Sequence, residues 1–250
     1  RTNIYLGSPG VLTVGARIES QATRGMSASE SSFGPSSGSR DYARFGRAGY
    51  LQALLEPVPR LSVTVGGRVD DNEKFGTYGT YRAGFSFRPV AGTRFRGAVG
   101  TGFKEPTFFE NFDTGFSRGN PDLKPEHSAS WEVGIEHTDA DRLRVGAVYF
   151  SQRFRDLIQY TFAPANPAGP NYYNVASANA SGVEVTAHLA VSGFTADGSY
   201  TNLNSNVLDA GFDTGPAANF VEGKRLLRRP THLASARLSR DLVGHGSLSG

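Results

Sequence analysis

The sequence predicts an all-β protein, a transmembrane antiparallel β-barrel to which this chain contributes about ten strands. Three observations support this prediction. Apolar and polar residues alternate along most of the chain, the apolar faces carry no ionised side chain, and short connections alternate with long ones. Together they indicate a sheet whose two faces meet different surroundings.

Alternation with a period of two residues is the main evidence for strands, because successive side chains of a strand point to opposite sides. In Arg60–Asp70, one leucine and three valines occupy odd positions, whereas polar residues dominate the even positions. Five further segments repeat this pattern: Tyr78–Arg88, Arg94–Phe103, Glu126–Glu136, Arg142–Phe150 and Gly182–Val191. Weaker alternation predicts four more strands: Gly10–Glu19, Arg44–Leu55, Phe194–Asn204 and Leu226–Arg240.

Connection lengths favour a membrane barrel over a soluble β-sandwich, whose apolar face would be equally uncharged. Short turns are predicted at Glu56–Arg60, Arg88–Arg94, Thr138–Arg142 and Val191–Phe194. Long connections alternate with them, at Ser20–Tyr42, Lys104–Pro125, Thr161–Asn171 and Ser205–Lys224, and Asp71–Thr77 is intermediate. Two stretches rich in Ser, Gly, Asn and Pro predict flexible loops: Gln21–Arg40 and Asn204–Gly223. Long loops on one rim are typical of outer-membrane barrels, whereas a Greek-key sandwich has no reason to alternate in this way.

The composition excludes several other classes. The 250 residues include no Cys, so disulfide scaffolds and thiolate metal sites are excluded. The net charge of +3 comes without a run of basic and aromatic residues, which argues against a nucleic-acid partner. The longest apolar runs, such as Val145–Phe150, fall far short of the roughly 20 residues of a membrane-spanning helix. No signal peptide is visible at the start of the sequence and Arg1 is not an initiator residue, so we expect the chain to come from a longer protein.

Motifs for chemistry are weak, and the sequence predicts no enzyme, no cofactor and no metal site. Gly34–Gly38 matches G-x-S-x-G but lies in a Ser/Gly-rich loop without the required strand and helix. The five histidines show no metal-binding spacing. The sequence contains one dense basic cluster, which consists of Lys224, Arg225, Arg228 and Arg229. Our hypothesis is that this cluster lies on the outer rim of the barrel and binds lipid A phosphates. Solvated strand-end or lumen-facing arginines are the alternative.

The middle of the chain carries three ordered sequence boxes. They are GFKEPT at Gly102–Thr107, GNPDLKPE at Gly119–Glu126 and WEVG at Trp131–Gly134. This series resembles the pattern of TonB-dependent outer-membrane receptors. The positions that carry the resemblance are Gly102, Phe103, Pro106, Asn120, Pro121, Leu123, Pro125, Glu126 and Glu132. Weaker matches extend it from about residue 45 to residue 235: Gly66–Asp70, Tyr173–Val175, Gly182–Glu184, Tyr200–Thr201 and Leu227–Pro230.

The resemblance implies a barrel of about 22 strands whose lumen holds a plug domain. Residues 1–250 would then be part of a single barrel domain, with the N-terminal plug and the closing C-terminal strands outside this chain. It further implies a bacterial outer-membrane receptor that imports a ferric siderophore or cobalamin. Its partners would be the TonB complex, the plug and lipopolysaccharide, and a passive porin is the alternative.

The segment Lys104–Gly119 is the predicted ligand-binding loop. It contains no His, Cys, Met or Tyr, so it offers no good ligand for haem iron. Aromatic rings, an amide and an arginine suit instead a ligand whose metal is already chelated. The candidate residues are Phe108, Phe109, Asn111, Phe112, Phe116 and Arg118. Packing of these rings within the loop is the alternative.

Overall fold

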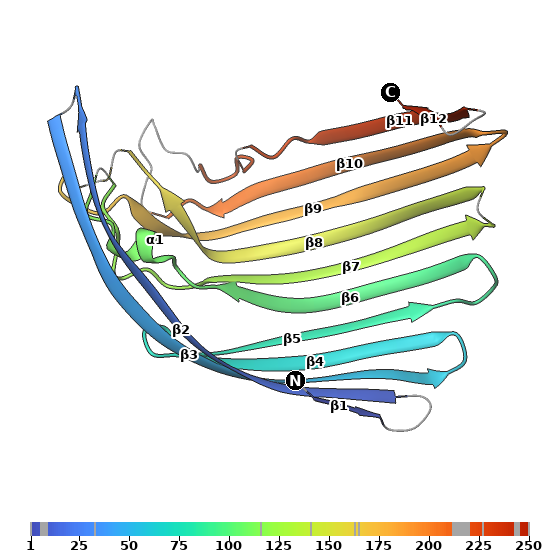
Figure 1. Ribbon diagram of the computed structural model, residues 1–250, viewed down its shortest axis with the longest axis horizontal. Coiled ribbons are helices and arrows are strands. Elements are labelled where there is room, and N and C mark those ends of the chain that lie inside the picture. The colour runs from blue at the N-terminus through green and yellow to red at the C-terminus, as the bar shows by residue number, and fades with distance from the viewer. Residues whose placement is uncertain are drawn as a thin grey trace.

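The computed structural model is one antiparallel sheet of twelve strands that pair in sequence order (Figure 1). It describes residues 2–5, 10–32, 34–115, 117–140, 142–162, 164, 166–211, 221–226, 228–242 and 246–249. The strands are β1 (Thr2–Tyr5), β2 (Gly10–Ser31), β3 (Gly34–Val58), β4 (Leu61–Asn72), β5 (Gly76–Phe87), β6 (Thr93–Lys104), β7 (Glu126–Asp139), β8 (Leu143–Tyr160), β9 (Tyr172–Val191), β10 (Phe194–Asp209), β11 (His232–Leu242) and β12 (Gly246–Ser249). The all-β prediction is confirmed, with two short strands added at the ends.

One face of the sheet is an apolar wall open to its surroundings. Strand register aligns the predicted apolar positions into rows. One row includes Leu61, Phe87, Phe95, Ile135, Ala147, Val185 and Tyr200, on the seven strands from β4 to β10. Large side chains of this wall stay about half exposed, as for Val65 at 50% and Trp131 at 48%. A soluble protein does not leave so broad an apolar face bare, but a barrel needs one against lipid.

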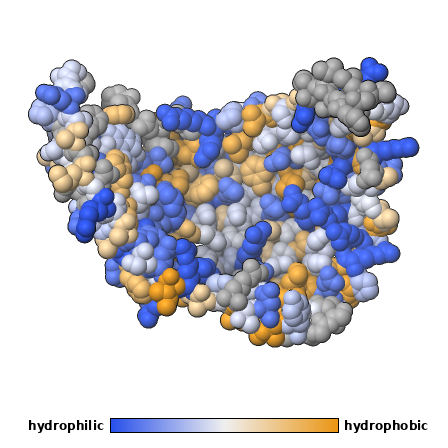
Figure 2. Space-filling view, in the orientation of Figure 1, coloured by the Kyte–Doolittle hydropathy of each residue, from blue (hydrophilic) through white to orange (hydrophobic). Residues whose placement is uncertain are grey.

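The opposite face is hollowed and polar, and Figure 2 shows hydrophilic residues spread across it. Arg94 pairs with Glu136 at 3.1 Å and Arg96 with Glu132 at 3.5 Å. Only a small conventional core accompanies these faces, since four hydrophobic side chains are fully buried in the described part of the chain: Leu123, Ile158, Ala178 and Val207. The two-faced sheet, rather than a central core, therefore determines the architecture.

The prediction of a long connection at Ser20–Tyr42 is wrong. β2 and β3 stay paired without interruption from Gly10 opposite Leu55 to Ser31 opposite Gly34. They form the long hairpin that rises on the left of Figure 1. Gly and Ser predicted a loop because they weaken strands individually, but the ladder between β2 and β3 continues without a break and hydrogen-bonds alternate residues of each strand.

Other boundaries also differ from the prediction. β10 continues to Asp209, so the predicted loop from Asn204 begins later, and residues 212–220 lie outside the described part. β11 begins at His232 rather than at Leu226. One helix, α1 (Phe108–Phe112), interrupts the connection Lys104–Pro125. In the described part of the chain, no helix has the length and apolar character needed to cross a membrane.

The short turns lie at the rim opposite α1, as predicted. The β9–β10 turn is a two-residue loop in which Ser192 has φ 52° and Gly193 has φ 78°. Positive φ at both positions matches the right-handed twist of the flanking strands. Such tight closure fixes the register of the neighbouring strands and hence which side chains face outward.

The assignment of faces can be tested on β4. Val65→Arg in the assembled barrel should lower the free energy of unfolding by about 2–4 kcal/mol, because it puts a cation against lipid. Thr64→Arg, one residue away on the polar face, should cost much less. Folded fractions from heat-modifiability gels would measure both variants, and equal damage would contradict the register.

Candidate functional site

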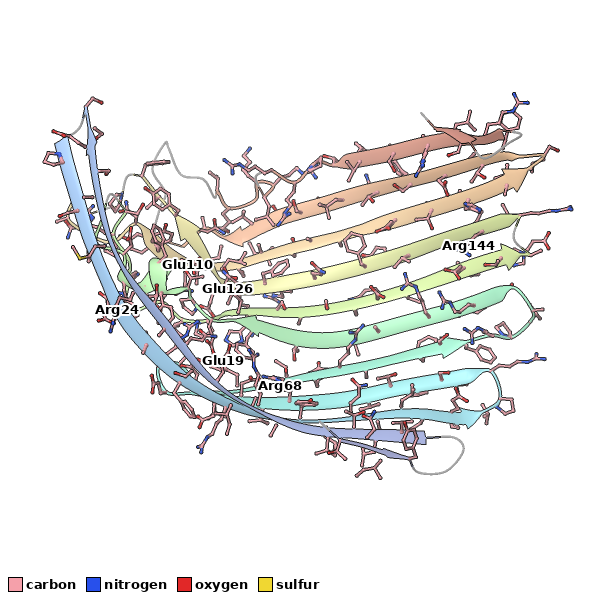
Figure 3. The ribbon with its side chains drawn as sticks, in the orientation of Figure 1. Glu19, Arg24, Arg68, Glu110, Glu126 and Arg144 are labelled. Atoms are coloured by element: carbon pink, nitrogen blue, oxygen red, sulfur yellow. The ribbon has the colours of Figure 1, made fainter. Side chains whose placement is uncertain are left out.

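The connection Lys104–Pro125, termed the motif loop, lies against the polar side of the sheet at the rim of the long connections. It contains α1, whose start is fixed by a capping box. The Glu110 backbone N–H donates to Thr107 Oγ1 at 3.1 Å, and the Thr107 N–H donates to Glu110 Oε2 at 2.7 Å. Lys104 Nζ lies 3.7 Å from Glu110 and 3.3 Å from Glu126. The two glutamates lie close together in Figure 3, far from Arg144 at the other rim.

Three family-motif side chains tie the motif loop to β8 and β9. Asn120 Nδ2 donates to Tyr172 O at 2.8 Å. Glu126 Oε1 accepts from the Ile158 N–H at 2.8 Å. Asn174 binds Lys124 on both sides, accepting from its N–H and donating to its carbonyl, each at 2.9 Å. These residues therefore hold the loop in place, and the motif is in this respect structural.

Gly119 is required by the close approach of the loop to α1. A Cβ at this position would lie 2.5 Å from Phe112 N and 2.6 Å from Asn111 C. Only glycine allows the two backbones to come this near. The Gly119 N–H donates to Asp113 O at 2.7 Å, and the Asn120 N–H to Glu110 O at 2.8 Å, which closes the loop on the helix.

The other end of the motif loop is anchored by Arg44 on β3. Its guanidinium donates to Pro106 O and to Gln21 Oε1, both at 2.7 Å, and lies 3.4 Å from Glu105 Oε2. Asn72 Nδ2 donates to the second Glu105 oxygen at 2.9 Å. Arg44 is only 11% exposed and Glu105 19%. Removing either would leave a buried charge without its partner.

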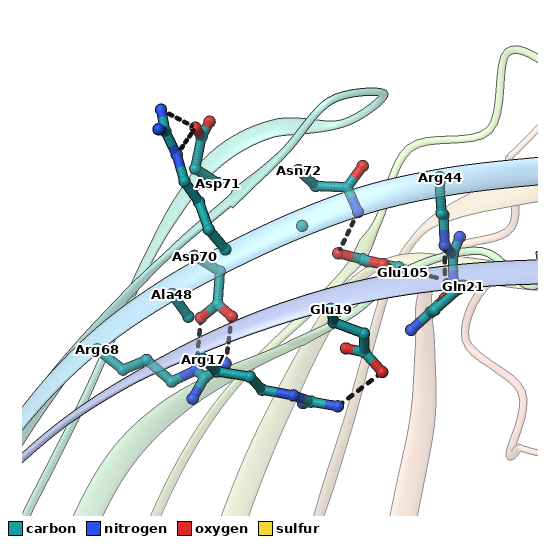
Figure 4. A pocket seen from close by; sticks show the side chains of 12 residues that line it. Arg17, Glu19, Gln21, Arg44, Ala48, Arg68, Asp70, Asp71, Asn72 and Glu105 are labelled. Atoms are coloured by element: carbon teal, nitrogen blue, oxygen red, sulfur yellow. Dashed lines mark hydrogen bonds and ion pairs between the residues drawn. The ribbon is translucent and has the colours of Figure 1, made fainter. Parts of the chain in front are cut away.

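Charged groups continue from Arg44 along the polar face, as Figure 4 shows. Arg68 forms a two-pronged ion pair with Asp70 at 2.7 and 2.5 Å. Arg17 pairs with Glu19 at 2.7 Å. This part of the wall is a matched set of positive and negative groups around a cavity of only about 40 Å³. It is a polar surface rather than a pocket for a small molecule.

Phe108 and Phe112 pack against cations of β3 and of the β4–β5 turn. The Arg44 guanidinium lies 4.7 Å from the Phe108 ring centre, and Lys74 Nζ lies 4.3 Å from that of Phe112. Tyr42 stacks on Phe112 at 4.2 Å. Burial lowers the pKa of Lys74, and Asp122 partly offsets this effect. These contacts hold the two rings against β3 and the β4–β5 turn.

A wide cavity of about 910 Å³ opens on the polar face beside the motif loop. Its walls are aromatic and aliphatic, with amide and guanidinium groups between: Phe150, Gln152, Phe154, Leu157, Gln159, Tyr160, Phe162, Ala180, Thr201, Leu203, Leu226, Arg228 and Arg229. The size and the mixture of apolar walls with a few polar groups are typical of small-molecule sites. We term it the rim cavity.

The predicted ligand residues of the motif loop differ in their surroundings. Asn111 is buried at 1% exposure and donates to Asn120 O, while its Oδ1 has no partner. Phe109 is 39% exposed and meets the Tyr172 ring edge-on at 5.9 Å. Arg118 donates to Pro167 O at 2.6 Å. Phe116 lies outside the described residues. The ligand role of these residues stays a prediction.

The rim cavity brings in residues that the sequence reasoning missed. Phe150 and Phe154 occupy polar-face positions of β8, next to outward Tyr149. Their departure from alternation was the available signal. Arg228 and Arg229, predicted to bind lipid A, line this cavity on the polar side, while Arg225 donates to Thr231 Oγ1 and to Leu203 O at 2.6 Å. That placement favours the lumen-facing alternative for Arg228 and Arg229.

The described residues include no group of three or more His, Cys, Asp or Glu side chains arranged to hold a metal ion. Two histidines of the described part instead contact side chains of neighbouring strands. His188 Nδ1 lies 2.7 Å from Asp197 Oδ1, and His232 Nδ1 lies 2.7 Å from the Tyr200 hydroxyl.

An antiparallel sheet with a bare apolar face, a charged inner face and a loop-covered rim defines the wall of an outer-membrane β-barrel. Comparison with known families agrees, since the family model described as TonB dependent receptor-like, beta-barrel matches residues 2–246. The chain belongs to this family, and its place is the bacterial outer membrane. The resemblance predicted from the sequence boxes is thereby confirmed.

Curated relatives include an iron-regulated outer membrane protein and a vitamin B12 transporter. The iron-regulated outer membrane virulence protein of Vibrio cholerae O1 El Tor is 29% identical over 77% of this chain and 31% of its own length. The vitamin B12 transporter BtuB of Vibrio vulnificus is 35% identical over 48% of the chain and 19% of its own length. The chain thus spans about a third or less of these relatives.

Solved structures share the fold. The siderophore receptor PirA of Pseudomonas aeruginosa superposes with a TM-score of 0.73 at 17% identity, covering 95% of this chain and 44% of that one. The copper transporter OprC superposes with a TM-score of 0.72 at 13% identity, covering 97% and 41%. At these identities the likeness concerns the fold alone.

Gly119 provides a test of how the motif loop is held. Gly119→Ala should loosen the loop, because its Cβ would clash with the α1 backbone. Gly115→Ala is the matched control, since its Cβ would meet only Asp113 carboxylate oxygens at 3.6 and 3.9 Å. Hydrogen exchange over residues 104–125 should rise at least about tenfold in the first variant alone, as expected for local opening. Equal protection in both variants would contradict the account.

Proposed function

We propose that this chain is part of a receptor that imports a ferric siderophore across the outer membrane, energised by TonB. Cobalamin is the second candidate ligand, favoured by the similarity to BtuB. No chemical step is involved, so the protein acts as a transporter rather than as an enzyme. The rim cavity is the observation that carries this proposal.

The chemistry of the rim cavity suits an anionic chelate. Arg228 and Arg229 supply two guanidinium groups, which form charge-assisted hydrogen bonds to anionic oxygens. Phe150, Phe154 and Tyr160 supply rings for the flat or apolar parts of a ligand. The volume of about 910 Å³ is at the large end for small-molecule pockets, as a metal chelate requires.

The motif loop supports a ligand that arrives with its metal already bound. Residues 104–119 include no His, Cys, Met or Tyr. Of its three carboxylates, Glu105 and Glu110 are engaged with Arg44 and with Lys104 or the α1 cap, and Asp113 is buried. Neither glutamate is therefore disposed to bind bare iron, and an organic chelator would have to supply the metal ligands.

The charged inner wall supports a plug domain as intramolecular partner. The ion pairs Arg17–Glu19 and Arg68–Asp70 lie on the face that the barrel encloses. Such pairs need water or a polar protein surface around them rather than lipid. We therefore assign residues 1–250 to one barrel domain that surrounds a plug, through which TonB would act.

Energy coupling distinguishes the receptor from a passive porin, which is the alternative. Cells that produce the receptor carrying this chain should accumulate the ferric chelate only with an intact TonB system and inner-membrane proton gradient. Uptake that persists at the same rate after TonB is deleted would favour the porin.

Ligand chemistry can be tested on the same purified receptor. The double substitution Arg228→Ala, Arg229→Ala should raise the Kd for an anionic ferric siderophore about tenfold or more, because charge-assisted hydrogen bonds contribute about 1.5–3 kcal/mol each. Arg237→Ala is the control, since Arg237 also lies on the inner face but near Arg144 at the opposite rim. Fluorescence titration with a panel of ferric siderophores, cobalamin and haem measures all variants. Tight binding of haem or cobalamin, and of no siderophore, would contradict the proposal.

A further inference from the structure

Two arginines stand on the lipid-facing wall of β8 near the long-loop rim. Arg153 and Arg155 continue the row of outward residues that includes Val145 and Tyr149, while Gln152 and Phe154 between them line the rim cavity on the inner side. Both arginine side chains are exposed. Charged residues on this wall are costly within the membrane, so their position along the strand decides their role.

Their position corresponds to the outer headgroup layer. A tilted strand crosses the hydrocarbon in about 9–11 residues. Counted from Leu143 at the short-turn rim, Arg153 therefore stands where the hydrocarbon ends. Trp131 and Tyr149, whose rings lie 5.2 Å apart, mark the interface just before it. The long-loop rim is external in outer-membrane barrels, so both arginines reach the outer leaflet.

Within the described part of the chain, these arginines also have no counter-ion. Two other outward arginines have one, since Arg47 pairs with Asp71 at 2.8 Å and Arg24 with Asp41 at 3.2 Å. Neither Arg153 nor Arg155 forms an ion pair with any carboxylate in the described residues. Their cross-strand neighbours are also not acidic: Ala129 and His127 on β7, and Asn179 and Ser177 on β9.

We propose that Arg153 and Arg155 form a binding site for the phosphate of an outer-leaflet lipid. The two residues lie two positions apart on one strand, about 7 Å, so their guanidinium groups can converge on one phosphate. Arg matches phosphate oxygens with two parallel hydrogen bonds and is weakly hydrated, which suits the interface. The lipid phosphate thus takes the place that the carboxylates of Asp71 and Asp41 have beside Arg47 and Arg24.

Native mass spectrometry of the detergent-purified receptor carrying this chain would test the site. The probes are bisphosphorylated lipid A, the same lipid with its phosphates removed, and inorganic phosphate. The substitution Arg153→Gln, Arg155→Gln should weaken binding of phosphorylated lipid A at least about tenfold and leave the dephosphorylated lipid unchanged, because only the phosphate forks are lost. Arg47→Gln, the control with an internal counter-ion, should bind lipid A as the unmodified receptor does.

Three outcomes would overturn the proposal. They are undiminished lipid A binding by the double variant, equal loss for the dephosphorylated lipid, and an equal loss in Arg47→Gln. Free phosphate that binds as tightly as lipid A would overturn the choice of a lipid as its source. If the glutamine variant fails to fold, Arg153→Lys with Arg155→Lys keeps the charge but removes the fork. This second variant should still lose part of the affinity for phosphorylated lipid A.

Discussion

The backbone ladder of the sheet, held in one register, is the constraint on which the rest of this structure depends. Because side chains alternate, a slip of one residue would turn the charged face to lipid and the apolar face to the lumen. The tight turns at the short rim, such as Ser192–Gly193, fix that register. Everything placed on either face, from the apolar rows to the ion pairs, follows from it.

At the rim of the long connections, the motif loop is held in place by side chains that form hydrogen bonds to the backbone. Asn120, Asn174 and Glu126 satisfy amides and carbonyls of segments about 30 to 50 positions apart in sequence. Arg44 does the same for the start of the motif loop. The recognisable family pattern thus includes residues that build the rim, while the cavity beside it is lined mostly by residues outside that pattern. Such a division lets one frame carry different ligand sites.

The strands and their facing could be predicted from the sequence because period-two alternation is enforced wherever one face meets lipid. The prediction of strands failed where neither face of the sheet meets lipid. The β2–β3 hairpin beyond the membrane is polar on both faces, so its Ser and Gly residues predicted a loop. The helix α1 is too short for a periodic signal, although Thr107 and Glu110 form a capping box. The rim cavity could not be predicted, because it joins β8 with Arg228 and Arg229, about 75 residues later.

Site-directed spin labelling along β8 tests the two-faced sheet most directly. Single Cys substitutions at positions 143–155 of the otherwise Cys-free chain would carry the label. In the membrane-embedded receptor, the rate at which the label collides with oxygen should be highest at odd positions up to 151. The rate of collision with a polar nickel complex should be highest near positions 153 and 155. A periodicity of two with the opposite phase, or none at all, would contradict the account.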